Sequence, residues 1–206
     1  MTTNTFSIKA VLQFGWETFK KDPWFYVGVV AALTVFSIIV NSLTSGGGAF
    51  GFIGFLISFA ASTVVSIAYA RLALSAAAGT HVGWEGLWAP EYFFNMLGAT
   101  ILQAIIIVVG FVLLVIPGVV AALMLCFTQL SVVDKKLGPI EALKESYRLT
   151  KGHLLELFLL VLALIVLNVI GAVLLVVGLL VTIPVTMIAV AHVYKKLASL
   201  QEPVII

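Results

Sequence analysis

Side chains able to perform chemistry are sparse in this 206-residue chain, and the clearest group lies near position 150. His153 and Glu156 are spaced i, i+3, so a helix would place them on one face. A metal site would need more ligands, and the other histidines are far away in sequence. We therefore expect an interfacial pair. The open alternative is contact with a lipid headgroup or a partner protein, which Arg148 and Lys151 would share.

Four amide side chains form a second group, and they lie inside long uncharged stretches: Asn95, Gln103, Gln129 and Asn168. Amides surrounded by lipid usually hydrogen-bond to neighbouring helices, so packing is the first expectation. The alternative is that they line the path of a small transporter or lipid translocator. No ionisable carboxylate or base lies at the middle of these stretches, which disfavours proton- or sodium-coupled transport.

The sequence contains none of the common catalytic motifs. Residues 46–48 are three glycines, but no Lys-Ser or Lys-Thr follows them, as a phosphate-binding loop would require. The single cysteine, Cys126, excludes an internal disulfide and a Cys-rich metal site. We expect a protein that is not an enzyme and that holds no cofactor or metal. A lipid-modifying enzyme acting through Glu156 and His153 is the least favoured alternative.

The elements that would position these side chains follow from three stretches without Asp, Glu, Lys or Arg. They cover residues 23–70, 92–133 and 157–194, and they are 48, 42 and 38 residues long. One helical crossing of a bilayer needs about 20 apolar residues, so each stretch is long enough for two crossings. The sequence predicts an all-α polytopic membrane protein with about six transmembrane helices in three hairpins.

Glycine and proline mark the expected turns of the hairpins, near residues 46–48, 110–117 and 178–184. Amphipathic patterns before the first and third hairpins predict cytoplasmic lead-in helices at the membrane surface. We expect one membrane domain over residues 1–206. Its parts would be an amphipathic helix at 1–22, hairpins at 23–70, 92–133 and 153–196, and a second amphipathic helix at 138–152.

All eleven basic residues lie outside the uncharged stretches, on the flanks that hairpins would bring to one side. Lys and Arg collect on the cytoplasmic side of membrane spans. The chain should therefore be a multi-pass protein of the plasma (inner) membrane with both termini in the cytoplasm. The net charge of +2 and the lack of a basic stripe argue against nucleic acid as a partner.

Small side chains recur every fourth residue within residues 54–70. Such rows let helix backbones approach closely in lipid. We expect the row to pack within the protomer, and a homo-oligomer interface is the alternative. Its members are Gly54, Ser58, Ser62, Ser66 and Ala70.

Several short motifs resemble an uncharacterised group of bacterial integral membrane proteins. This group comprises the YciC-like inner-membrane proteins and the membrane domain found beside glycerophosphoryl diester phosphodiesterases. The resemblance implies about six spans but no agreed activity and no catalytic residues. It rests on residues 14–21 (Phe-Gly-Trp-Glu-Thr-Phe-Lys-Lys), Ile116-Pro117-Gly118, residues 142–152 and residues 178–184 followed by Tyr194.

Together these observations favour a non-enzymatic membrane protein that organises or senses the lipid phase, anionic lipid or another membrane protein. Its partner in every case is the lipid bilayer. A small transporter or lipid translocator is the alternative.

The predicted sidedness can be tested with reporters of compartment. A reporter fused to either terminus should report the cytoplasm, because every cation would then stay on that side. A reporter inserted at residues 46–48 should report the opposite compartment. Two reporters in the same compartment would overturn the hairpin arrangement.

Overall fold

The computed structural model describes residues 6–44, 49–173 and 177–201, and its regular structure within these ranges is entirely helical. Six helical segments are long and apolar enough to cross a membrane, which confirms the predicted all-α, multi-span fold. They are built from α2 (Pro23–Thr44), α3 (Ala49–Ala77), α5 (Phe93–Leu113), α6 (Val115–Met124), α7 (Thr128–Lys135), α9 (Leu154–Val173) and α10 (Val177–Gln201).

The second hairpin turns where the glycine and proline pattern predicted. α5 ends at Leu113, Leu114 is extended, and α6 begins at Val115 with Pro117 in its first turn. Proline is tolerated there because the first turn has no intrahelical acceptor for its missing N–H. The predicted turn at residues 46–48 lies outside the described residues.

The third turn differs from the prediction. Residues 178–184 are helical, because α10 begins at Val177 and continues through Pro184. Gly178 serves a close helix crossing instead of a turn, since a Cβ there would lie 2.2 Å from the carbonyl oxygen of Gly171 in α9. Its missing side chain lets the start of α10 approach the end of α9.

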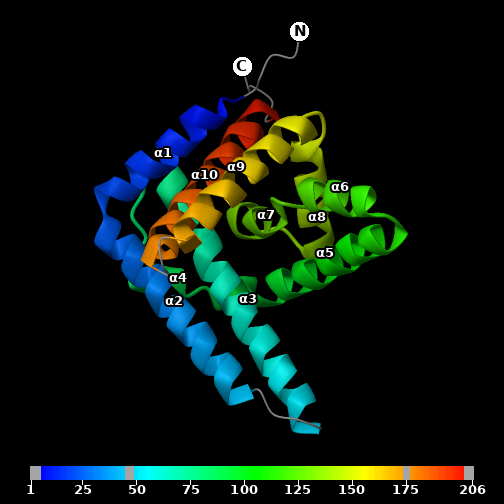
Figure 1. Cartoon of the computed structure of the whole chain (residues 1–206). Coiled ribbons are helices and arrows are strands. Elements are labelled where there is room, and N and C mark those ends of the chain that lie inside the picture. Colours follow the sequence, from blue (N-terminus) through cyan, green and yellow to red (C-terminus); the bar gives the residue numbers. More distant parts are fainter. Residues whose placement is uncertain (1–5, 45–48, 174–176, 202–206) are drawn as a thin grey trace.

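Burial is concentrated at the charged ends of the hairpins. In Figure 1 the α2–α3 pair extends downward and the α5–α6 pair to the right, with α7 and α8 (Pro139–Thr150) between them and the α9–α10 pair. Large apolar side chains near the turns are exposed, as membrane helices facing lipid require. They include Ile38, Leu43, Phe52, Phe55, Val112, Leu113, Ile116, Val169 and Val173.

The N-terminal helix α1 (Ile8–Lys21) packs along α10. Gly15 is the point of closest approach, because a Cβ there would lie 2.7 Å from the carbonyl oxygen of Val185. Beside it the ring of Phe14 stacks on His192 with 3.9 Å between centroids. The apolar face that the sequence assigned to a surface lead-in is therefore covered by a protein helix. The weak pattern before the second hairpin is only the short α4 (Trp84–Leu87) and η1 (Pro90–Tyr92).

The row of small side chains on α3 meets three different surroundings. Gly54 and Ser58 face Thr44 of α2, whose hydroxyl hydrogen-bonds with that of Ser58. Ser62 is exposed and donates to the Phe59 carbonyl of its own helix. Ser66 and Ala70 line a cavity on another side. The row divides because four residues exceed one helical turn, so each step rotates about 40° around the axis.

The close α9–α10 crossing generates a stability prediction. Gly178→Val should lower the free energy of unfolding by about 1 to 3 kcal/mol, because the new side chain meets backbone that cannot move aside. Gly28→Val is the matched control, since the nearest atom to a Cβ at Gly28 is 3.9 Å away. Thermal unfolding in detergent, followed by dye labelling of the free Cys126 thiol, measures both. Equal midpoints for the two variants would contradict the prediction.

Candidate functional site

A cavity of about 320 Å³ lies between α3, the start of α7, α9 and α10. Most of its wall is apolar, and no charged side chain lines it among the described residues. Its volume lies at the lower end of the range for small-molecule sites. The residues that line it include Ser66, Ala70, Gln129, Asn168, Thr186 and Met187.

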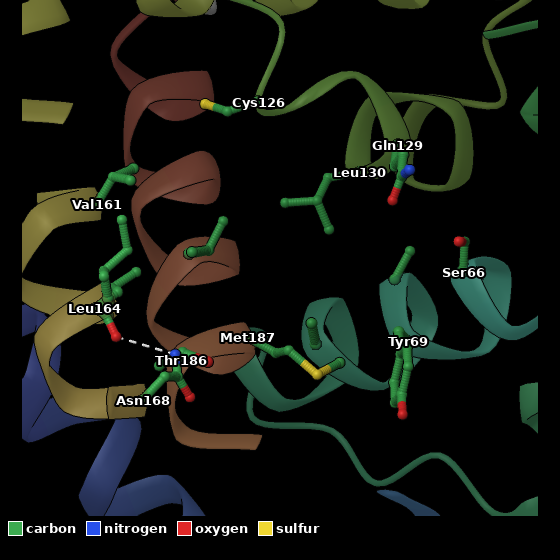
Figure 2. Close-up of a pocket in the computed structure, with 14 residues that line it drawn as sticks. Ser66, Tyr69, Cys126, Gln129, Leu130, Val161, Leu164, Asn168, Thr186 and Met187 are labelled. Atoms are coloured by element: carbon green, nitrogen blue, oxygen red, sulfur yellow. Dashed lines mark hydrogen bonds between the residues drawn. The ribbon is translucent and has the colours of Figure 1, made fainter. Parts of the chain in front are cut away.

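The polar groups of the cavity lie at two ends of an apolar middle. Figure 2 shows the Gln129 amide directed toward the Ser66 hydroxyl on one side, and Asn168 beside Thr186 on the other, with Met187 between them. The Asn168 amide nitrogen donates to the Leu164 carbonyl at 3.0 Å. The Asn168 Oδ1 is buried and has no hydrogen-bond partner among the described residues. A buried acceptor without a donor is costly, so this oxygen is a candidate contact for a ligand.

The cavity borders a break in the fourth span. α6 ends at Met124 and α7 begins at Thr128, so backbone groups between them lose their helical partners. The Met124 carbonyl accepts from Ser146 Oγ at 2.9 Å and Thr150 Oγ1 at 3.2 Å, both on α8. The Ser146 hydroxyl also accepts from the Phe127 N–H at 3.1 Å. Irregular backbone at membrane depth is tolerated where protein groups satisfy it in this way.

The structure separates the four amides that the sequence singled out. Gln129 and Asn168 line the same cavity. Gln103 donates from α5 to the Leu125 carbonyl at 3.0 Å, so it helps to cap the broken span. Asn95 is half-buried on α5 and is not part of this cavity wall.

The wall residues Ser66 and Thr186 and the capping residues Ser146 and Thr150 were not predicted as a group. Ser146 and Thr150 carried one signal, because both fall on the buried face of an amphipathic helix. A polar side chain at such a position needs a hydrogen-bond partner. The sequence could not name that partner.

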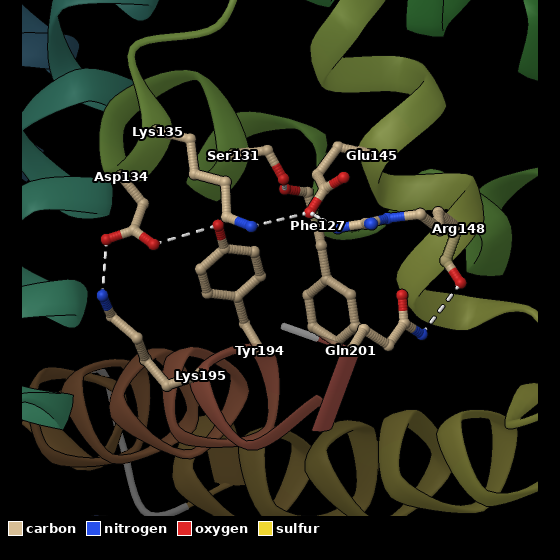
Figure 3. A network of polar contacts seen from close by, with 9 residues as sticks. All are labelled: Phe127, Ser131, Asp134, Lys135, Glu145, Arg148, Tyr194, Lys195 and Gln201. Atoms are coloured by element: carbon tan, nitrogen blue, oxygen red, sulfur yellow. Dashed lines mark hydrogen bonds and ion pairs between the residues drawn. The ribbon is translucent and has the colours of Figure 1, made fainter. Parts of the chain in front are cut away.

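Next to the break, ion pairs join α7, α8 and α10, as Figure 3 shows. Asp134 binds Lys195 and accepts from the Tyr194 hydroxyl at 3.1 Å. Glu145 accepts from Lys135 at 2.9 Å and from Arg148 at 2.8 Å. We call these six residues the polar clamp. It connects the last turn of the broken span to the lead-in helix and to the last span.

The residues predicted to contact a headgroup lie at the end of α8, in the turn after it and at the start of α9. Arg148 is held by Glu145, and its carbonyl accepts from Gln201 at 3.1 Å. Lys151 is exposed in the turn after α8. His153 Nδ1 lies 3.9 Å from Glu156 Oε2, as the i, i+3 spacing predicted. In the part of the chain that the structure describes, no three His, Cys, Asp or Glu side chains lie together as a metal ion would require.

Within the polar clamp, the carboxyl of Glu145 has a lowered pKa. Burial alone would raise the pKa of its carboxyl, but the hydrogen bonds and charges of Arg148 and Lys135 outweigh it and lower the pKa below 4.5. The clamp is therefore fully formed above the ordinary pKa of a glutamate. It weakens as the pH falls through the lowered pKa and the carboxyl becomes protonated.

Acid should thus destabilise the protein through this carboxyl. Glu145→Gln should lower the free energy of unfolding by about 1 to 3 kcal/mol at pH 7, because the cations Lys135 and Arg148 would then donate to a neutral amide oxygen instead of a carboxylate. The difference between the variant and the natural chain should shrink as the pH falls below about 4.5 and through the lowered pKa. Thermal midpoints in detergent across this range measure it. Glu141→Gln, on the exposed face of the same helix, is the control, and an equal effect there would contradict the assignment.

Comparisons with known proteins bear on the family of the chain. No curated protein and no solved structure shows significant similarity to it. The YciC-like proteins and the phosphodiesterase-linked membrane domains are not among the matches, so the expected resemblance holds only in its coarser form, an uncharacterised family. Residues 20–205 match a domain of unknown function, DUF7847. The chain therefore belongs to the family defined by this domain.

Proposed function

We propose that this multi-pass protein binds a neutral, mainly apolar molecule of the lipid phase in the cavity between α3, α7, α9 and α10. The binding would be non-enzymatic. The observation that carries the proposal is the Asn168 Oδ1, which is buried and has no hydrogen-bond partner among the described residues, in a mainly apolar wall. A bound hydroxyl or amide N–H would give this oxygen its missing hydrogen bond.

The ligand class follows from the charge of the wall. A charged ligand would lie unpaired in this cavity, because none of its described lining residues is ionised, and unpaired charge in an apolar site is strongly disfavoured. A lipid such as diacylglycerol supplies what the wall requires: a hydroxyl donor for Asn168 and acyl carbons for the apolar middle. Ile165, which is exposed on α9, lies in the wall and connects it to the lipid-facing surface.

The distribution of basic residues supports a location in the plasma (inner) membrane with both termini in the cytoplasm. In that orientation the polar clamp lies toward the cytoplasmic side of the cavity. A role in sensing or organising lipid would follow from ligand binding next to the broken span.

A small transporter or lipid translocator is the second candidate, and the broken span favours it. Many secondary transporters bind substrate where a discontinuous helix lines a cavity near the middle of the bilayer. Gln129 lies on α7 just after the break, and it lines this cavity. The two candidates differ in whether water reaches the amides.

Photocrosslinking tests the binding proposal. Diacylglycerol carrying a diazirine in one acyl chain is mixed into phosphatidylcholine vesicles that contain the protein, and labelled peptides are identified by mass spectrometry. Label should appear on α9 and α10. Asn168→Leu should reduce it about tenfold because it removes the hydrogen-bond acceptor, and Ala70→Phe should reduce it by filling the cavity.

Ala32→Phe is the control for Ala70→Phe, since Ala32 is exposed on α2 and outside the cavity. Unchanged labelling in both Asn168→Leu and Ala70→Phe would contradict the binding proposal. In a Cys126→Ala background, a membrane-impermeant thiol reagent should fail to label Gln129→Cys and Asn168→Cys. Rapid labelling of both from water would favour the conduit instead.

A further inference from the structure

A second cavity, of about 310 Å³, lies on another side of α3, between this helix and the α4–α5 segment. We call it the aromatic groove. Trp88 and Phe94 are 65% and 80% exposed, so large aromatic surfaces form its outer edge. All of its lining residues are apolar: Val64, Ile67, Leu87, Trp88, Ala89, Pro90, Phe93 and Phe94.

Arg71 lies one helical turn beyond the part of α3 that lines this groove. It follows Val64 and Ile67 at i+7 and i+4 on α3, so it continues the face that lines the groove. Arg71 is also the only Lys or Arg in the sequence between Lys21 and Lys135. A single cation next to an apolar groove favours a ligand that has an apolar part for the groove and a negative charge at the end near Arg71.

The contacts of Arg71 leave its guanidinium available to an anion. Its Nη1 lies 3.7 Å from Glu91 Oε1, which is longer than the 2.7–3.2 Å of a hydrogen bond. Its Cζ lies 6.0 Å from the centre of the Tyr92 ring, so the ring orients the cation without using its N–H donors. Its side chain is 27% exposed and thus reachable from the surface.

We propose that the aromatic groove and Arg71 form a binding site for one anionic glycerophospholipid. An acyl chain lies in the groove against Trp88 and Phe94, and the phosphate receives N–H bonds from Arg71. Guanidinium matches phosphate because it can donate two parallel hydrogen bonds to it. Tryptophan suits the same depth, since its ring prefers the boundary between headgroups and acyl chains.

Glu91 should weaken the binding of an anionic lipid at this site. Its carboxylate lies 3.7 Å from the guanidinium that the phosphate must approach, and like charges repel. Glu91→Gln should therefore strengthen binding of the anionic lipid, whereas a merely structural Arg71–Glu91 pair would predict no gain. This site shares no lining residue with the cavity of the proposed function, so either proposal can fail alone.

Tryptophan fluorescence provides the test. Trp16, Trp24 and Trp84 are replaced by Phe so that Trp88 is the remaining reporter. The protein is placed in phosphatidylcholine vesicles, and brominated phosphatidylglycerol or brominated phosphatidylcholine is added at equal mole fractions. Brominated phosphatidylglycerol should quench Trp88 with an apparent affinity about fivefold higher than that of the choline lipid.

Variants of Arg71 and Glu91 test whether Arg71 binds the phosphate. Arg71→Gln should abolish the preference, Arg71→Lys should retain part of it, and Glu91→Gln should increase it. Lys144→Gln, on the exposed face of α8, removes the same net charge and should leave the preference unchanged. Equal quenching by the two lipids in the chain that has Trp88 alone and keeps Arg71, or equal losses in Arg71→Gln and Lys144→Gln, would overturn the proposal. Circular dichroism and size exclusion confirm that each variant is folded.

Discussion

The broken fourth span depends on one constraint, which is that backbone groups surrounded by lipid find no water to hydrogen-bond with. Ser146 meets this constraint from α8, because its single hydroxyl donates to the Met124 carbonyl and accepts from the Phe127 N–H. Thr150 and Gln103 satisfy what remains on the carbonyl side. These bonds dock α8 against the bundle, and the polar clamp then ties both to the last span.

The three hairpins pack against one another where α8 docks, and they separate toward their turns. Side chains such as Phe127, Leu149 and Tyr194 are fully buried there, whereas the ends near the turns present large apolar side chains outward. In water such surfaces would drive association, but lipid solvates them as well as protein does. Close approach of helices is therefore achieved with small residues, as at Gly15 against α10 and Gly178 against Gly171.

The two cavities lie on different sides of α3 and differ in the polarity of their walls. The larger one offers neutral hydrogen-bonding groups beside the broken span, and its described wall has no charge that could hold an anion. The aromatic groove has no polar lining but ends near a solitary guanidinium. α3 supplies Ser66 and Ala70 to one cavity and Val64 and Ile67 to the other. The lipid proposed for the first cavity is neutral and the phospholipid proposed for the aromatic groove is anionic, so the two ligands differ in charge as well as in location.

The sequence alone determined the helices, because the free energy of placing a residue in lipid depends mainly on that residue, and charge-free runs therefore predict spans directly. It also located the turn at Leu114, since Gly110 and Pro117 carry that information locally. The break between Met124 and Thr128 was decided only by tertiary structure. No glycine or proline marks it, and its caps come from Ser146 and Thr150, which lie 19 to 26 residues away from their partners. The cavity and the divided surroundings of the small-residue row depend likewise on which helices meet, because a helical face acquires its partner only when distant segments pack together.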